Sequence, residues 1–130
     1  MPWLYPDRMP AVRRLFRLRE ALAPYLSVEY EHCRRTGDPL IAPVFLREPS
    51  YDPESDCFFC GRRLLACPVF DEGAAAVTVL LPRTSRLWRL RGEGETFPGG
   101  TQVTVPCAPE DLPVCSPRRR TRQRAFRQKE

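Results

Sequence analysis

Cysteines are the residues whose spacing points most directly to chemistry in this chain. Six of them occur in 130 residues, and Cys57 and Cys60 stand with Gly61 in a C-x-x-C-G motif. The N-terminal residues lack the apolar run of a secretory signal, because prolines at positions 2, 6 and 10 interrupt the candidate segment. The sequence therefore predicts free thiols, and a thiol pair at this spacing is typical of a metal or redox site.

Zinc is the metal that this motif favours. In a zinc knuckle the chain turns tightly after the second thiolate, and Gly61 can adopt the positive φ that such a turn needs. A structural zinc ion takes four ligands, and a proline-rich segment near residues 106–115 could wrap around it. We therefore predict a zinc site formed by Cys57, Cys60, Cys107 and Cys115, with His32 and Cys33 as alternative ligands.

Two other interpretations of the cysteines stay open. The thiols could be inert and buried, and Cys67 in particular lies in the apolar segment 64–70, which predicts a small buried side chain. A redox role for the C-x-x-C pair would need a helix N-terminus to lower the pKa of one thiol. Phe58 and Phe59 indicate no such helix start.

Arginine provides nearly all of the positive charge. The net charge is +5, and because Lys129 is the only lysine, 20 of the 21 basic residues are arginine. The C-terminal run is too poor in apolar residues to pack, so we expect a disordered tail that imports the protein into the nucleus or binds nucleic acid. A tail that only aids solubility is the alternative. The tail arginines are Arg118, Arg119, Arg120, Arg122, Arg124 and Arg127.

The N-terminal third predicts an amphipathic helix that begins near Pro10 and ends before Gly37. Its apolar residues recur at helical spacing, and Pro24 is expected to kink or divide it. We expect the apolar side to pack on a sheet, while a partner-binding or membrane-surface helix and a mitochondrial presequence are alternatives. The apolar residues are Val12, Leu15, Phe16, Leu22 and Leu26.

Apolar segments after the helix predict short strands at 42–47, 64–70, 75–81, 86–91 and 101–105, with the clearest alternation at Val103 to Val105. The expected fold class is α+β. In it, an N-terminal amphipathic helical segment packs on a small, mostly antiparallel β-sheet with a zinc knuckle, and a disordered basic C-terminal tail follows. The predicted organisation is an N-terminal extension at 1–9, a single α+β domain at 10–115 and the arginine-rich tail at 116–130.

Catalytic motifs are scarce. The single histidine, His32, stands beside Cys33, and adjacent side chains seldom reach one substrate together. The sequence has no glycine-rich phosphate loop, no G-x-S-x-G elbow and no carboxylate pair with a mechanism behind it. It therefore predicts a non-enzymatic protein, and we expect no transmembrane segment.

The combination of a C-x-x-C-G motif with a terminal arginine run resembles the compact accessory proteins of viruses. These include cysteine-rich nucleic-acid-binding proteins, silencing suppressors of plant viruses and early regulatory proteins of DNA viruses. The resemblance implies a small regulatory protein that binds host or cellular proteins, with a tail that directs it to the nucleus and allows shuttling with the cytoplasm. The alternative is a protein that binds RNA or DNA through the tail, such as a silencing suppressor or a transcriptional regulator.

Overall fold

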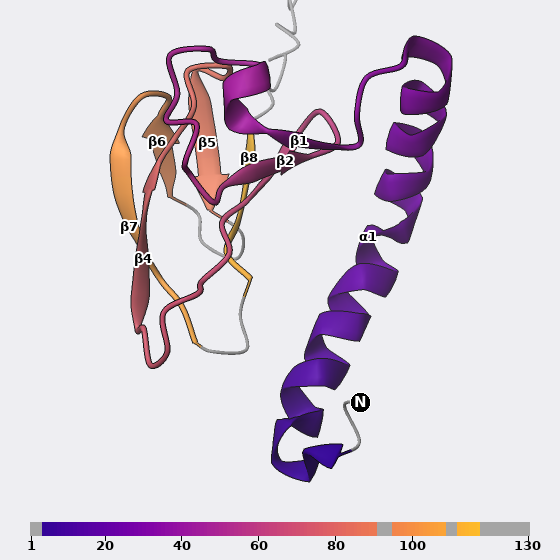
Figure 1. Ribbon diagram of the computed structural model, residues 1–130, viewed down its shortest axis with the longest axis vertical. Coiled ribbons are helices and arrows are strands. Elements are labelled where there is room, and N and C mark those ends of the chain that lie inside the picture. Colours follow the sequence, from indigo (N-terminus) through magenta and orange to yellow (C-terminus); the bar gives the residue numbers. More distant parts are fainter. Residues whose placement is uncertain (1–3, 91–94, 109–111, 118–130) are drawn as a thin grey trace, which may run out of the picture.

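The computed structural model describes residues 4–90, 95–108 and 112–117, and it shows one long helix beside a β-sandwich (Figure 1). Helix α1 (Met9–Thr36) follows a short 3-10 turn, η2 (Pro6–Arg8). A second 3-10 turn, η3 (Val44–Leu46), follows the first strand. Within the described ranges, no helix is both long enough and apolar enough to cross a lipid bilayer.

The described residues form two antiparallel sheets. The larger one has six strands in the order β1-β2-β3-β8-β5-β6, and the smaller one pairs β4 with β7. Strand β8, the last in the chain, therefore lies between β3 and β5 at the middle of the larger sheet. The strands are β1 (Ile41–Pro43), β2 (Phe58–Cys60), β3 (Leu64–Ala66), β4 (Ala76–Leu80), β5 (Leu87–Leu90), β6 (Thr96–Pro98), β7 (Gln102–Pro106) and β8 (Val114–Pro117).

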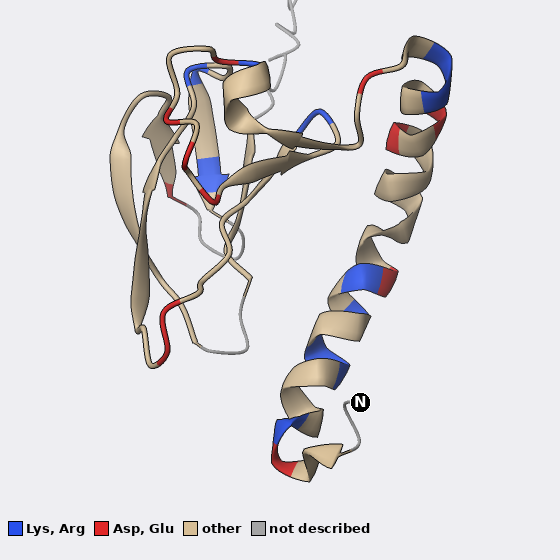
Figure 2. Cartoon of the chain, in the orientation of Figure 1, with Lys and Arg blue, Asp and Glu red and all other residues tan. Residues whose placement is uncertain are grey.

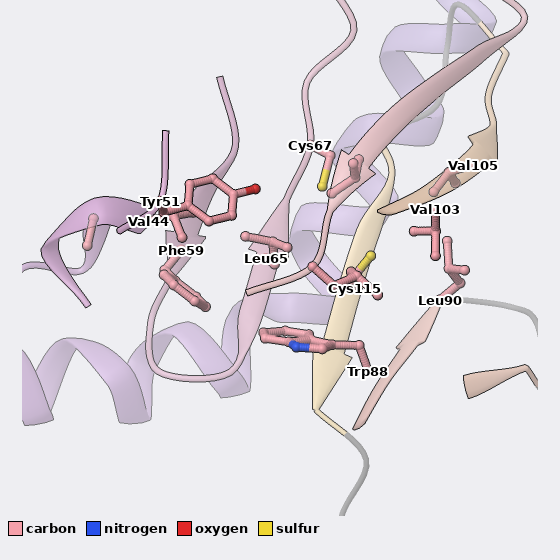
Figure 3. Close-up of a cluster of buried hydrophobic side chains, with 13 residues drawn as sticks. Val44, Tyr51, Phe59, Leu65, Cys67, Trp88, Leu90, Val103, Val105 and Cys115 are labelled. Carbon is pink, nitrogen blue, oxygen red and sulfur yellow. The ribbon is translucent and has the colours of Figure 1, made fainter. Parts of the chain in front are cut away.

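The hydrophobic core lies between these two sheets (Figure 3). The larger sheet contributes Leu65 and Trp88, which are 0% and 1% exposed, and the smaller sheet contributes Val103 and Val105. Thr104, between the two valines, is exposed, so the alternation predicted for this strand is confirmed. Side chains in a strand point alternately to opposite faces, and each sheet thus buries one face against the other.

Helix α1 is a single helix of 28 residues. Gly37 ends it in the left-handed conformation, with φ of 80°, and its N–H donates to the carbonyl oxygen of Cys33 at 2.8 Å. This ending agrees with the predicted stop. Pro24 lies inside the helix without dividing it into two.

The N-terminal half of α1 is largely uncovered. Leu15 is 43% exposed and Phe16 is 60% exposed, so the prediction that these two side chains pack on the sheet is wrong. Figure 1 agrees with this exposure, because none of the described strands lies against this half of the helix. Basic residues occur along the same half (Figure 2).

The predicted α+β class is also wrong, since the structure is a β-sandwich. We expected a helix to cover the buried face of one sheet, whereas the pair of strands β4 and β7 covers it. Three strands were missed, namely β2, β6 and β8, and two of these have only three residues. An alternation of period two is not recognisable over three residues, and only pairing with neighbouring strands defines such elements.

Candidate functional site

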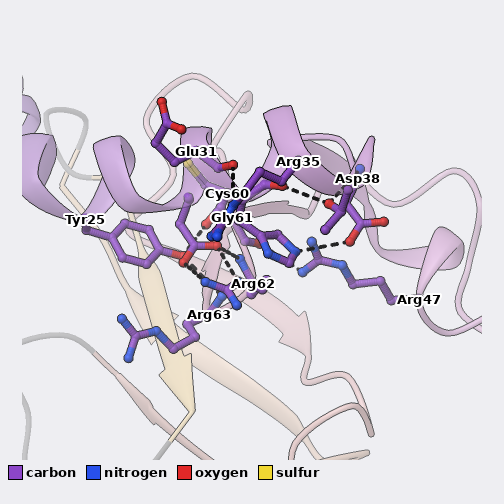
Figure 4. Close-up of polar contacts among 12 residues, drawn as sticks. Tyr25, Glu31, Arg35, Asp38, Arg47, Cys60, Gly61, Arg62 and Arg63 are labelled. Carbon is purple, nitrogen blue, oxygen red and sulfur yellow. Dashed lines mark hydrogen bonds and ion pairs between the residues drawn. The ribbon is translucent and has the colours of Figure 1, made fainter.

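A cluster of polar contacts joins the C-terminal half of α1 to the turn between β2 and β3 (Figure 4). We call this cluster the helix clamp and define it as Tyr25, Glu29, Cys60, Gly61, Arg62 and Arg63. The hydroxyl of Tyr25 donates to the carbonyl oxygen of Cys60 at 2.9 Å and accepts from the backbone N–H of Arg63 at 3.2 Å. One phenol thus bonds both sides of the turn.

Glu29 lies one helical turn after Tyr25 and is the only buried charged side chain among the described residues, at 1% exposure. Its carboxylate accepts three hydrogen bonds from Arg62, from the backbone N–H at 2.8 Å and from Nε and Nη2 at 3.0 Å each. The Arg62 side chain holds the pKa of Glu29 below its usual value, although burial acts in the opposite direction. Glu29 is therefore a charged anchor for the turn.

Gly61 is the residue that lets the helix approach so closely. Its φ is +66°, and its N–H donates to the carbonyl oxygen of Leu40 at 2.6 Å. A Cβ at this position would lie 2.5 Å from the Tyr25 hydroxyl and 2.6 Å from Cγ of Glu29. No ordinary side chain fits there, so the glycine of the C-x-x-C-G motif serves the contact with the helix.

The structure does not bring the four predicted zinc ligands together. Cys57 immediately precedes β2 and Cys60 ends it, three residues apart, so their side chains point to opposite faces of the sheet. Cys107 follows β7 of the other sheet, where its thiol donates to the carbonyl oxygen of Ala74 at 3.9 Å. Cys115 lies in β8. In the described part of the chain, no group of three or more His, Cys, Asp or Glu side chains could hold a metal ion, and the expected zinc knuckle is corrected to a hairpin turn.

The alternative ligands lie on α1. Nε2 of His32 is 3.2 Å from the carboxylate of Asp38, and Cys33 provides the carbonyl oxygen that closes the helix. The His32 side chain and the Cys33 carbonyl group therefore both make contacts with the residues that follow the end of α1. Cys67 is 0% exposed, which confirms the prediction that it is a buried side chain.

The six predicted tail arginines lie outside the described residues. They are Arg118, Arg119, Arg120, Arg122, Arg124 and Arg127. Nuclear localisation through this tail stays a prediction from its composition.

A hollow of about 380 Å³ lies beside the helix clamp. Arg47 spans one side of it, since its Nη1 donates to the carbonyl oxygen of Gly61 at 2.9 Å and its guanidinium lies 4.5 Å from the centre of the Phe59 ring. The hollow contains one carboxylate and two guanidinium groups, and so it offers no pair of carboxyl groups for acid–base chemistry. Its lining residues are Asp38, Pro39, Ala42, Leu46, Arg47 and Arg62.

Comparison with protein families decides which group this sandwich belongs to. Residues 37–117 match the model of the glycosyl hydrolase family 31 C-terminal domain. The chain belongs to this family. The matched segment begins at the glycine that ends α1 and runs to the end of β8, and it therefore contains both sheets of the family 31 domain.

The similarity to known relatives extends beyond this domain and covers most of the chain. A probable glucan 1,3-alpha-glucosidase of Oryza sativa subsp. japonica is 30% identical over 117 residues, 86% of this chain and 12% of the relative. An alpha-xylosidase of Emericella nidulans is 32% identical over 126 residues, 88% of this chain and 16% of the relative. The chain thus spans less than a fifth of the length of these two relatives.

Solved structures share the fold. The cycloalternan-degrading enzyme from Trueperella pyogenes, in complex with cycloalternan, superposes with a TM-score of 0.79 at 30% identity. The match covers 90% of this chain and 17% of that enzyme. Residues 37–130 are less than three quarters of the chain, so the superposition includes part of the segment that forms α1. A counterpart of this helix is therefore present in the relative.

These matches overturn the predicted function. The chain does not belong with viral accessory, host-protein-binding or nucleic-acid-binding regulators, because its family is a glycosidase family. The prediction of a non-enzymatic protein is wrong for the same reason. The resemblance rested on a C-x-x-C-G motif that forms a hairpin turn and on an abundance of arginine, and neither feature is specific to those proteins.

Sequence reasoning also missed the residues that form the helix clamp. Tyr25 and Glu29 are four residues apart, which places both on one side of a helix. In the sequence, one acidic residue among apolar residues is only a weak signal of a buried ion pair. Arg62, the partner of Glu29, directly follows Gly61, which we had interpreted as the turn of a zinc knuckle. A glycine at position 61 is also what a close approach of a helix requires, and that interpretation would have connected α1 with the turn between β2 and β3.

Proposed function

We propose that this chain forms the C-terminal β-sandwich of a glycoside hydrolase that acts on α-linked glucosides or xylosides. The match of residues 37–117 to the family 31 C-terminal domain is the observation that carries this proposal. The names of the relatives agree with it, since they include a probable glucan 1,3-alpha-glucosidase, an alpha-xylosidase and a cycloalternan-degrading enzyme.

In this proposal the reacting carboxyl groups come from outside the described residues. Glycosidases commonly use two carboxyl groups that flank the scissile bond, and the general acid among them has a raised pKa. The buried acid found here, Glu29, has the opposite property, because the bonds from Arg62 lower its pKa. Glu29 is thus suited to holding structure together and unsuited to donating a proton. The sandwich supports the catalytic part of the enzyme.

Helix α1 is the element through which this support acts. Its C-terminal half is held by the helix clamp, whereas Leu15 and Phe16 in the N-terminal half are exposed apolar side chains. Burying such side chains against another surface is favourable, at roughly 25 cal/mol per Å² of apolar area. We expect the N-terminal half to pack against the catalytic part, and the helix clamp then fixes the sandwich to it.

Hydrolysis of chromogenic glycosides tests the activity. The complete protein that contains this chain is assayed with 4-nitrophenyl α-glucoside and α-xyloside, and with the two β-anomers as controls. We expect release of nitrophenol from at least one α-glycoside and from neither β-anomer. Activity on the β-anomers alone, or on none of the four substrates, would overturn the proposed function.

Substitution of Phe16 tests the role of the helix. Phe16→Ser should leave the unfolding of the 130-residue chain nearly unchanged, because an exposed side chain contributes little to stability. In the complete protein it should lower the melting temperature, because there the ring is buried. Exposed Tyr5, which lies outside α1, provides the matched control Tyr5→Ser. Equal effects of the two substitutions in the complete protein would contradict the proposed packing.

A further inference from the structure

Two cysteines face each other across the β2–β3 hairpin. The antiparallel register pairs Phe58 with Ala66 and Phe59 with Leu65. The ladder ends at Phe58 and Ala66, and extending its register by one residue places Cys57 opposite Cys67, in agreement with the contact between the two thiols. Cys57 lies on the same side of the hairpin as the buried Phe59, two residues away, and therefore points toward the core.

A third cysteine lies on the other side of Cys67. Cys115 of β8 is paired with Leu65, two residues before Cys67, so the two thiols share the core face as diagonal neighbours. The N–H of Cys67 donates to the carbonyl oxygen of Pro113 at 3.0 Å, which extends this pairing beyond the end of β3. Both thiols are drawn at the centre of the core in Figure 3.

The three thiols differ in access to solvent. Cys67 and Cys115 are each 0% exposed, whereas Cys57 is half-buried. A small reagent from solvent therefore meets Cys57 first. Cys67 lies directly behind it and is shielded from the same reagent.

The surroundings of Cys57 favour its thiolate. The neighbouring Cys67 thiol, and after it the Ser55 hydroxyl, lower the pKa of Cys57 to about 7 in spite of burial. A thiolate is the nucleophilic form of cysteine. Cys60 makes a clear contrast, because burial and the nearby charge of Glu29 raise the pKa of its thiol.

We propose that Cys57 is a peroxide-reactive cysteine and that Cys67 is its resolving partner, so that oxidation joins them in a disulfide across the hairpin. Residues directly opposite each other in antiparallel strands have Cα atoms about 4.5 or 5.5 Å apart. A disulfide spans Cα separations of about 4.4–6.8 Å, and this range includes the separations expected for directly opposite residues. The Cys115 thiol also lies at hydrogen-bond distance from Cys67. However, Cys115 is a diagonal neighbour, and Cα atoms at diagonal positions are about 7–8 Å apart, which exceeds the usual span of a disulfide.

The reaction consumes one hydroperoxide. The Cys57 thiolate attacks one oxygen of hydrogen peroxide, the O–O bond breaks, and a sulfenic acid and one water molecule form once the leaving hydroxide takes up a proton. The sulfur of Cys67 then attacks the Cys57 sulfur, the S–O bond breaks, and the second water leaves with the proton of the Cys67 thiol. Two thiols are oxidised to one disulfide and one peroxide is reduced to two waters.

Peptide mapping tests the pairing. The reduced full chain is treated at pH 7 with a small excess of hydrogen peroxide, remaining thiols are blocked with N-ethylmaleimide, and the protein is digested with trypsin. Arg62 and Arg63 lie between the two cysteines, so trypsin separates residues 48–62 from residues 64–83. We expect mass spectrometry to find these two peptides joined by a disulfide, and a Cys67–Cys115 disulfide or no disulfide would overturn the proposal.

Cys60 supplies the matched control, because it lies on the same strand with similar exposure but on the opposite face. Cys60→Ser should keep the disulfide, whereas both Cys57→Ser and Cys57→Ala should abolish it. Without peroxide at pH 7, N-ethylmaleimide should modify Cys57 at least several-fold faster than Cys60. Equal rates, or loss of the disulfide in Cys60→Ser with retention in Cys57→Ser, would contradict the assignment.

Discussion

Replacement of Gly61 by alanine measures how much the close approach of helix α1 contributes to stability. The backbone there has φ of +66°, and a left-handed conformation costs an L residue roughly 1–2 kcal/mol. The new Cβ would also lie 2.5 Å from the Tyr25 hydroxyl and 2.6 Å from Glu29. Tyr25 must then move away from the carbonyl oxygen of Cys60, and a hydrogen bond of this kind contributes about 0.5–1.5 kcal/mol. Together these effects predict a loss of about 1.5–3.5 kcal/mol for Gly61→Ala.

Gly73 provides the matched control for this substitution. Its φ is +73°, and no atom lies within 4 Å of a Cβ built on it. Gly73→Ala should therefore lose only the conformational part, roughly 1–2 kcal/mol. The free energy of unfolding of both variants is measured by urea titration followed by circular dichroism. If the two variants lose the same free energy, the helix does not press on Gly61 and our account of the clamp is refuted.

Two further substitutions probe the clamp and the core. Because the folded-state pKa of Glu29 is lowered, its ion pair with Arg62 stabilises the fold at pH values above the unfolded pKa of about 4.5, and this contribution is lost as the pH falls through the folded pKa. Glu29→Gln should therefore melt at a lower temperature than the wild type at pH 7, with a difference that shrinks toward pH 3; a constant difference would argue against the ion pair. Trp88→Phe removes the indole N–H that donates to the carbonyl oxygen of Pro82 at 2.8 Å. Leaving that buried carbonyl without a partner should cost about 1–3 kcal/mol in a urea titration, and a loss under 0.5 kcal/mol would show that the bond contributes little.

Local patterns were sufficient for part of this fold. The apolar spacing from Val12 to Leu26 predicted the helix, and Gly37 predicted its end, because a helix and its glycine cap depend on residues close together in the chain. The alternation at Val103 to Val105 likewise predicted a strand with one buried face. No such pattern marks β8, whose four residues become a strand only between β3 and β5.

The meaning of the C-x-x-C-G motif depended on contacts that the sequence does not display. The glycine at position 61 showed that the backbone adopts a conformation there that other residues disfavour. A turn around zinc and a close approach of a helix both require a glycine, so the sequence did not distinguish between them. The structure decided between them, because Tyr25 and Glu29 occupy the space beside Gly61. Strand geometry then placed Cys57 and Cys60 on opposite faces, whereas Cys57 faces Cys67 across the hairpin.

The sequence by itself determined the positions where the chain must be helical, extended or turned, since these follow from each residue's own conformational preferences and from spacing along the chain. Tertiary structure decided which segments meet. The helix lies against a turn 35 residues away instead of covering the sheet, and a second sheet buries the core. Such choices depend on shape and charge complementarity between distant segments, and that complementarity exists only once the chain is folded.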